Sequence, residues 1–215
     1  MNKSVYSLVL TDEIVRQIDR AAYEMNTSRS NLINQVLADY VSYQTPEKRM
    51  REVFTQIERM LTGTSRFEVL LQPSDAMFSL RTALSYKYNP NVRYSVELFR
   101  GELPLIGELR VSLRSQNSAL LLYVLQFFKL WARIEQTYIG ETDHAIEQNR
   151  YLRRFSLREG VKADNERIGQ AIADYIRLLD TAMQRFFSLL DDPAAAIKQV
   201  DALYQRHLRE ATMIL

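Results

Sequence analysis

Apolar positions near the N-terminus recur at three- and four-residue steps in two successive stretches. We predict one helix from Thr11 to about Met25 and a second from Ser30 to about Tyr43. Thr11 and Ser28 are the expected N-caps, because their hydroxyls can accept from free backbone N–H groups. The apolar faces comprise Ile14, Ile18, Ala21, Ala22 and Met25 in the first helix, and Leu32, Ile33, Val36, Leu37, Tyr40 and Val41 in the second.

A short extended run, Val5 to Leu10, precedes the first helix. A lone strand leaves its backbone N–H and C=O groups unpaired, and one strand with two helices cannot bury a core. Pairing of the strand with its copy from a second chain would solve both problems. The sequence therefore predicts that the first segment is completed only in a dimer.

This order of strand, helix, turn and helix resembles the ribbon-helix-helix (Arc-like) family of DNA-binding proteins over residues 3–43, about a fifth of the chain. In that family two strands form an antiparallel ribbon that enters the major groove. The family register implies that Tyr6, Leu8 and Leu10 face the helices, and that Lys3, Val5, Ser7 and Val9 face the bases. Val5 and Val9 depart from the family pattern, because polar or basic side chains usually stand there and bases are read by hydrogen bonds.

The resemblance also implies a second contact, at the start of the second predicted helix. Backbone N–H groups at a helix N-terminus bind phosphate, and Ser28, Arg29 and Ser30 would add hydroxyls and a cation. Such contacts position a protein on DNA without reading sequence. The alternative interpretation is that Ser28 is only a helix cap and that Arg29 is only a solvated charge.

The remainder of the chain predicts a separate α+β domain. Pro46 marks the expected boundary, with a DNA-binding and dimerisation module at residues 1–45 and a domain of unknown role at 46–215. A helix is expected from about Glu47 to Leu61. Apolar and polar residues then alternate over about 66–114, which predicts an antiparallel meander with one dry and one wet face. Residues 116–213 are predicted to be wholly helical. The expected fold class is thus mixed: a ribbon-helix-helix arm followed by an α+β domain.

The wet face of the predicted meander gathers positive charge. Glu97 is the one acidic residue expected among its cations, which are Arg81, Lys87, Arg93, Arg110 and Arg114. This face could meet nucleic acid phosphate or an acidic partner. Alternatively it is a solvated sheet face, on which arginine discourages aggregation between edges.

Composition excludes several classes of protein and chemistry. The chain has no cysteine and a net charge of +2, so neither a disulfide framework nor a global electrostatic attraction to nucleic acid is expected. Its two histidines, His144 and His207, lack a ligand pattern, and both are expected on helix surfaces. No phosphate loop, nucleophile elbow or dinucleotide motif is present. We expect no enzyme activity, no metal and no cofactor. Without a signal-peptide core or a membrane-length apolar run, a cytoplasmic protein is expected.

By resemblance, the expected function is sequence-specific binding of double-stranded DNA by a homodimer, or a higher even-numbered homo-oligomer, in transcriptional repression. Symmetry would make the target a palindrome. A first alternative keeps the same module in plasmid partition or a DNA-transfer complex. A second removes DNA altogether: the arm only dimerises, and residues 46–215 form a protein-interaction scaffold.

Overall fold

The chain divides into two compact units, Met1–Lys48 and Arg49–Leu215. The computed structural model describes residues 5–41, 43, 45–63, 66–70, 74–100, 104–147, 149–157 and 164–215.

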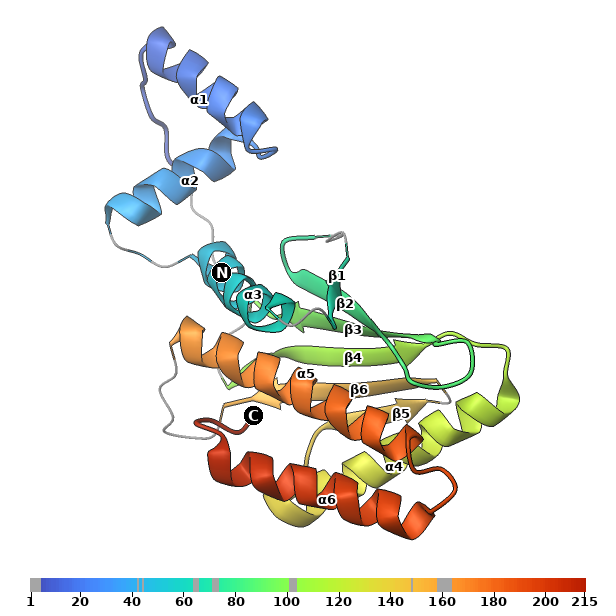
Figure 1. Cartoon of the computed structure of the whole chain (residues 1–215). Coiled ribbons are helices and arrows are strands. Elements are labelled where there is room, and N and C mark those ends of the chain that lie inside the picture. Colours follow the sequence, from blue (N-terminus) through green and yellow to red (C-terminus); the bar gives the residue numbers. More distant parts are fainter. Residues whose placement is uncertain are drawn as a thin grey trace. The chain divides into compact units, whose positions relative to one another are not determined.

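The N-terminal unit is a pair of helices joined by a tight turn (Figure 1). Helix α1 (Asp12–Glu24) begins after Thr11, whose Oγ1 accepts from the N–H of Ile14 at 3.5 Å. The chain reverses at Asn26, which has a φ of 49°, and α2 (Arg29–Tyr40) follows. Asparagine tolerates this left-handed conformation better than most residues do. The two predicted helices are therefore confirmed, with α2 beginning one residue earlier and ending about three residues earlier than expected.

The predicted N-terminal strand is wrong. Residues 5–10 form no strand. The side chains expected to face the helices and those expected to face the bases are all exposed to solvent in this segment. No two-stranded ribbon precedes α1 in the described structure, which overturns the ribbon-helix-helix arm in the expected fold class. The physical reason is that a strand is stable only when it is hydrogen-bonded to a partner strand, and none of the described strands of this chain pairs with residues 5–10.

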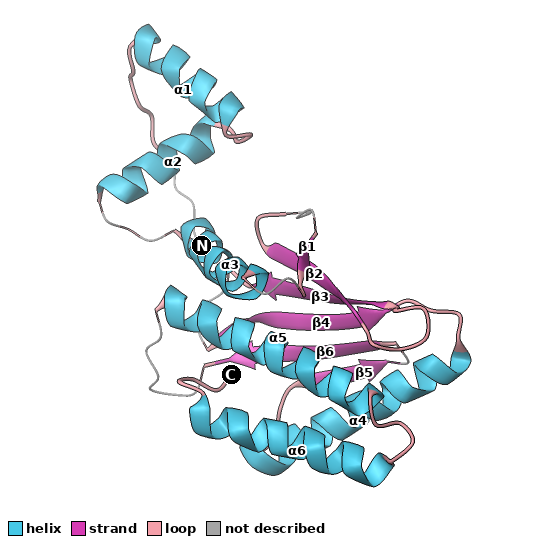
Figure 2. Ribbon diagram, in the orientation of Figure 1, coloured by secondary structure: helices cyan, strands magenta, loops and turns pink. Residues whose placement is uncertain are grey.

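The C-terminal unit is a six-stranded antiparallel sheet covered by helices (Figures 1 and 2). The strand order is β1-β2-β3-β4-β6-β5. The strands are β1 (Glu68–Val69), β2 (Met77–Ala83), β3 (Asn91–Leu98), β4 (Leu105–Leu113), β5 (His144–Glu147) and β6 (Arg150–Ser156). The helices are α3 (Pro46–Thr62), α4 (Ser118–Ile139), α5 (Asn165–Phe187) and α6 (Pro193–Glu210).

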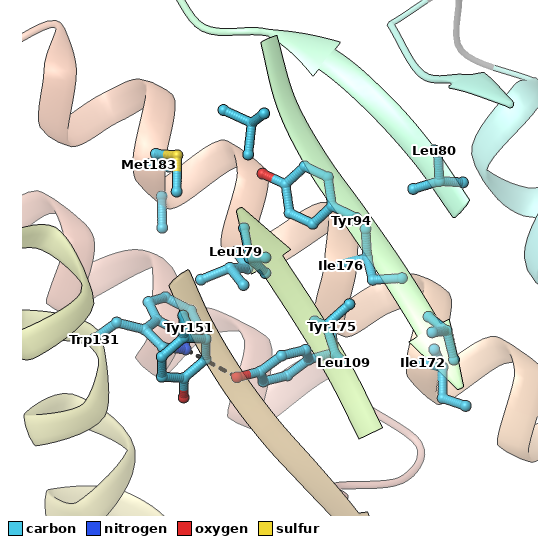
Figure 3. Close-up of a cluster of buried hydrophobic side chains, with 14 of the residues drawn as sticks. Leu80, Tyr94, Leu109, Trp131, Tyr151, Ile172, Tyr175, Ile176, Leu179 and Met183 are labelled. Carbon is cyan, nitrogen blue, oxygen red and sulfur yellow. Dashed lines mark hydrogen bonds between the residues drawn. The ribbon is translucent and has the colours of Figure 1, made fainter. Parts of the chain in front are cut away.

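The helices of this unit gather on one face of the sheet. The strands alternate accordingly: in β3, Val92, Tyr94 and Val96 are buried beneath the helices, whereas Arg93 is exposed on the other side. Helix α5 supplies much of the cover, with Ile172, Ile176 and Leu179 packed near the strands, and Trp131 of α4 extends the same core (Figure 3). None of the described helices of this unit covers the opposite sheet face (Figures 1 and 2).

The prediction that residues 116–213 are wholly helical is wrong. The hairpin of β5 and β6 interrupts the helices and adds two strands to the sheet, with β6 paired to β4. His144 accordingly lies in a strand and not on a helix, whereas His207 lies in α6 as expected. Strand β6 has the period-two burial of Tyr151, Arg153 and Phe155, but the arginine in the middle hides that alternation from a hydrophobicity pattern. The mixed α+β character of the chain remains.

Candidate functional site

The residues expected to read DNA bases do not form a common surface. Val5, Ser7 and Val9 are all exposed in a segment without regular structure, and Lys3 lies outside the described residues. The exposed valines have no packing partner in the described structure that would fix their direction. The base-reading role of Lys3, Val5, Ser7 and Val9 stays a prediction from the sequence.

The start of α2 is a capped and charge-paired helix end. Ser28 Oγ accepts from the N–H of Asn31 at 3.2 Å, and Ser30 is exposed beside it. The guanidinium of Arg29 donates twice to the carboxylate of Asp19 on α1, at 2.6 and 2.5 Å. These hydrogen bonds lower the pKa of Asp19 below its ordinary value. Arg29 therefore ties the two helices together, a role that the sequence pattern did not indicate, while its side chain remains half exposed.

An exposed apolar surface of the N-terminal unit lies along the C-terminal half of α2. Val36, Leu37, Tyr40 and Val41 stand at four-residue spacing on one side of the helix end, and they are between 49% and 88% exposed. The charge nearest to them in sequence, Asp39, is neutralised by Lys48 at 2.7 Å. Among the described residues of this unit only Ala22, Leu32 and Ala38 are buried hydrophobics. The unit thus exposes more large apolar side chains than it buries. We call Val36, Leu37, Tyr40 and Val41 the α2 stripe.

The open face of the sheet in the C-terminal unit forms a basic concavity of about 810 Å³. Four of the five predicted cations line it, namely Arg81, Arg93, Arg110 and Arg114. Lys87 does not, because β2 ends at Ala83 and Lys87 lies in the following turn. Arg150 of β6 joins the lining instead. The sequence pattern did not indicate Arg150, because its segment was predicted to be helical and buried Arg153 hides the alternation of residues 150–156.

Ser112 lies at the centre of these arginines. Its cross-strand partner on β3 is Arg93, and its partner on β6 is Arg150. Arg110 and Arg114 stand two residues before and after it, which places them on the same side of the extended chain. All five residues line the concavity. We call Ser112, Arg93, Arg110, Arg114 and Arg150 the arginine ring.

Carboxylates balance much of this positive charge, more than the sequence pattern suggested. Arg81 binds Glu68 through two hydrogen bonds, at 2.9 and 2.7 Å, and Arg110 pairs with Glu97 at 3.1 Å and also with Glu108. The sequence pattern indicated Glu97. It did not indicate Glu68, which lies beside Arg81 because β1 pairs with β2, or Glu108, which stands two residues before Arg110 on β4. The pairing is incomplete, because Arg93 and Arg114 have no ion pair within the described part of the chain.

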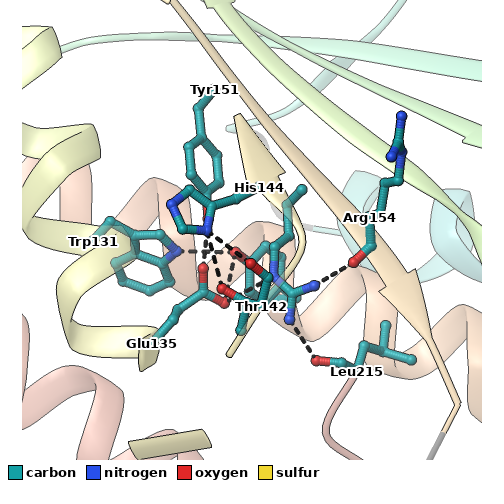
Figure 4. A network of polar contacts seen from close by, with 9 residues as sticks. Trp131, Glu135, Thr142, His144, Tyr151, Arg154 and Leu215 are labelled. Carbon is teal, nitrogen blue, oxygen red and sulfur yellow. Dashed lines mark hydrogen bonds and ion pairs between the residues drawn. The ribbon is translucent and has the colours of Figure 1, made fainter. Parts of the chain in front are cut away.

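A second polar cluster is centred on the buried side chain of Glu135, and Figure 4 draws it with its neighbours. Glu135 of α4 accepts from Tyr151 at 2.5 Å and from Tyr175 at 3.1 Å, and it pairs with Arg153 at 3.3 Å. Burial raises the pKa of Tyr151 and Tyr175 well above the ordinary value, so both phenols keep the protons that they donate. Arg153 also donates to the backbone oxygen of Leu215 at 2.9 Å. These partners are all internal, so the cluster connects α4, α5, β6 and the last residue of the chain without offering a reacting group to solvent.

Asp180 of α5 is a second buried carboxylate. It accepts from the hydroxyls of Thr82 at 2.9 Å and Tyr94 at 3.1 Å, and it pairs with Arg66 at 2.9 Å. Burial raises the pKa of Asp180 above its ordinary value of 3.8, although Arg66 and the two hydroxyls act in the opposite direction. The carboxyl therefore binds its proton more tightly in the folded protein than in the unfolded chain.

This raised pKa predicts a pH dependence of stability. The contribution of Asp180 is fully present below its unfolded pKa and is lost as the pH rises through the folded pKa. The amide of the Asp180→Asn variant does not titrate, so the stability of the wild type relative to this variant should fall as the pH rises above 3.8. Urea unfolding of both proteins over a series of pH values from acid to neutral measures the difference. A difference that is constant or grows with pH would contradict the assignment.

Neither a metal site nor a membrane span is found where the structure describes the chain. No group of three or more histidine or acidic side chains converges there, and none of the described helices is long and apolar enough to cross a bilayer. Comparison with known proteins adds no assignment: no family model, curated protein or solved structure matches this chain. The α2 stripe, the start of α2 and the arginine ring are therefore the features on which a function can be based.

Proposed function

We propose that this protein is a DNA-binding homodimer that regulates transcription and assembles through its N-terminal unit. The observation that carries the proposal is the α2 stripe. Burying a valine or leucine side chain contributes roughly 1.5–3 kcal/mol, and the stripe leaves two valines and one leucine in water in each chain.

A second copy of this chain is the occupant that fits the stripe. Two-fold symmetry lets one apolar surface cover itself, and the charge of Asp39 beside it is already held by Lys48. The same symmetry would present two copies of the α2 start. Each copy offers free helical N–H groups, the hydroxyl of Ser30 and the half-exposed guanidinium of Arg29, and these groups suit DNA phosphates.

The test compares Leu37→Asp with Asn34→Asp. Leu37 belongs to the stripe, whereas Asn34 is an exposed polar residue on the same helix. We expect wild type and Asn34→Asp to have twice the chain mass of 25.2 kDa in light scattering after gel filtration, and Leu37→Asp to have the single-chain mass. Fluorescence anisotropy with a labelled mixed-sequence duplex should show wild-type binding that weakens steeply as salt rises from about 50 to 200 mM, and at least tenfold weaker binding by Leu37→Asp.

Two results would overturn parts of this proposal. A wild-type protein of single-chain mass removes the homodimer. A wild-type dimer that ignores DNA at low salt removes DNA binding and leaves the interaction scaffold as the function. That second candidate is favoured by one specific observation, the bidentate ion pair with Asp19 that already occupies Arg29.

A further inference from the structure

We infer that the arginine ring of the C-terminal unit is a phosphate-binding site that contacts the backbone of double-stranded DNA. The inference rests on the proposed DNA binding and adds a second surface to it. This surface would raise affinity for all sequences alike, because phosphate contacts carry no base information.

The strand register builds the site. Arg93, Ser112 and Arg150 stand side by side on β3, β4 and β6. Neighbouring strands are about 4.8 Å apart, so these three positions span roughly 10 Å. Guanidinium groups offer paired N–H donors that match phosphate oxygens, and the Ser112 hydroxyl adds a donor between them. Arg110 and Arg114 extend the same donors along β4. The uncovered sheet face therefore presents several cations around one hydroxyl.

Charge at the ring is incompletely neutralised by the carboxylates that the structure describes. Arg81 and Arg93 are direct cross-strand partners, and like charges in that relation destabilise a sheet. Arg81 is compensated by Glu68, whereas the described contact of the Arg93 guanidinium is with the Ser79 hydroxyl, at 3.2 Å. Arg150 pairs with Glu147 at 3.7 Å, in a largely exposed pair that contributes little. A bound anion would relieve this repulsion, and that relief favours a ligand with negative charge.

The chemistry of the face favours a duplex backbone over a single strand. Single-stranded nucleic acids are held largely by stacking of bases on aromatic side chains. Tyr151, the one aromatic residue among the described lining, is fully buried toward the helices. The remaining lining is mainly arginine, serine and asparagine, with Glu147 as its acidic member. The arginine, serine and asparagine side chains hydrogen-bond to phosphate and offer no platform for bases.

The experiment measures the salt dependence of duplex binding by the full chain. Arg93→Ala/Arg114→Ala removes two ring arginines that lack an ion pair in the described structure. Arg133→Ala/Arg209→Ala removes two exposed arginines from α4 and α6 and is the matched control. Each lost phosphate contact should reduce the slope of log K against log salt by about 0.9, so the ring variant should lose about 2 from the slope. The control should keep the wild-type slope, and Arg93→Lys/Arg114→Lys should restore most of it.

A second pair of variants tests the centre of the ring. Ser112→Asp places a carboxylate among the arginines and should weaken duplex binding at least tenfold, whereas Ser112→Ala should have a small effect. Thermal unfolding of each variant checks that the fold is retained. Equal slopes for the ring variant and its control would overturn the inference while DNA binding itself stands. Tighter wild-type binding to single-stranded RNA than to the duplex would also overturn it. A wild-type protein that ignores DNA at low salt would overturn the proposed function as well.

Discussion

Replacing Glu135 by alanine is expected to lower the free energy of unfolding by about 3–5 kcal/mol. Glu135 is 0% exposed, and its partner Arg153 is only 4% exposed. Removing the carboxylate leaves the guanidinium charge enclosed without a counter-charge, and it also leaves the hydroxyls of Tyr151 and Tyr175 without their acceptor. Breaking one side of a buried ion pair costs far more than the pair itself contributes. Urea unfolding followed by circular dichroism measures the change.

The adjacent residue provides the control. Gln136→Ala, one position along α4 and exposed, should change stability by less than about 0.5 kcal/mol. The double replacement Glu135→Met/Arg153→Met should be less destabilising than the sum of the two single replacements, because it removes both charges together. Equal unfolding midpoints for Glu135→Ala and Gln136→Ala would show that the enclosed cluster does not stabilise the fold.

Gly107→Ala is expected to destabilise the sheet by about 3 kcal/mol, at the upper end of overpacking effects. Gly107 stands on β4 beside a register shift and pairs with Leu98. A Cβ atom there would lie 2.2 Å from the carbonyl oxygen of Glu97 and 3.0 Å from the Cα of Leu98. Both neighbours are backbone atoms of β3, so the clash cannot be relieved by turning a side chain, and the two strands must separate. Thermal and urea unfolding both report the loss.

Gly63→Ala is the matched control for this replacement. The nearest atom to its added Cβ is the carbonyl oxygen of Arg59 at 3.7 Å, an ordinary van der Waals distance. Its stability should therefore stay within about 1 kcal/mol of the wild type. If Gly107→Ala were as stable as Gly63→Ala, the close approach of β3 and β4 at this point would be wrong.

Local signals in the sequence predicted the helices well. The caps at Thr11 and Ser28 are each made by a side chain that accepts from a backbone N–H three residues later, and short-range chemistry suffices to place them. The strands from Met77 to Leu113 followed from alternation because β2, β3 and β4 have a dry face and a wet face. Helix α4 lies within the stretch at 116–213 that was predicted to be helical.

At two places the prediction from local patterns was wrong, because the structure there depends on pairing between segments that are distant in the chain. Residues 5–10 have the composition of a strand. A strand is stable only beside a partner strand, and composition does not show whether a partner is present. The segment from His144 to Ser156 contains buried Arg153, whose burial depends on Glu135, eighteen residues earlier on another element. A hydrophobicity pattern reads such an arginine as a surface residue, and therefore misses the hairpin that completes the sheet.

For the basic face of the sheet too, the sequence predicted some features and the tertiary structure decided others. Arg81, Arg93, Arg110 and Arg114 were identifiable as one face by their alternation along individual strands. The pairing of Arg81 with Glu68, the addition of Arg150 and the exclusion of Lys87 depended on which strands are neighbours and where β2 ends.

By itself the sequence determined the helices of the N-terminal unit, the central antiparallel strands and the exposed position of most arginines, because caps and periodicity act over a few residues. The tertiary structure decided that residues 5–10 form no strand, that β5 and β6 join the sheet, and that Ser112 is surrounded by arginines. Those features arise from contacts between segments far apart in the chain, and the free energy of such contacts depends on partners that local patterns do not specify.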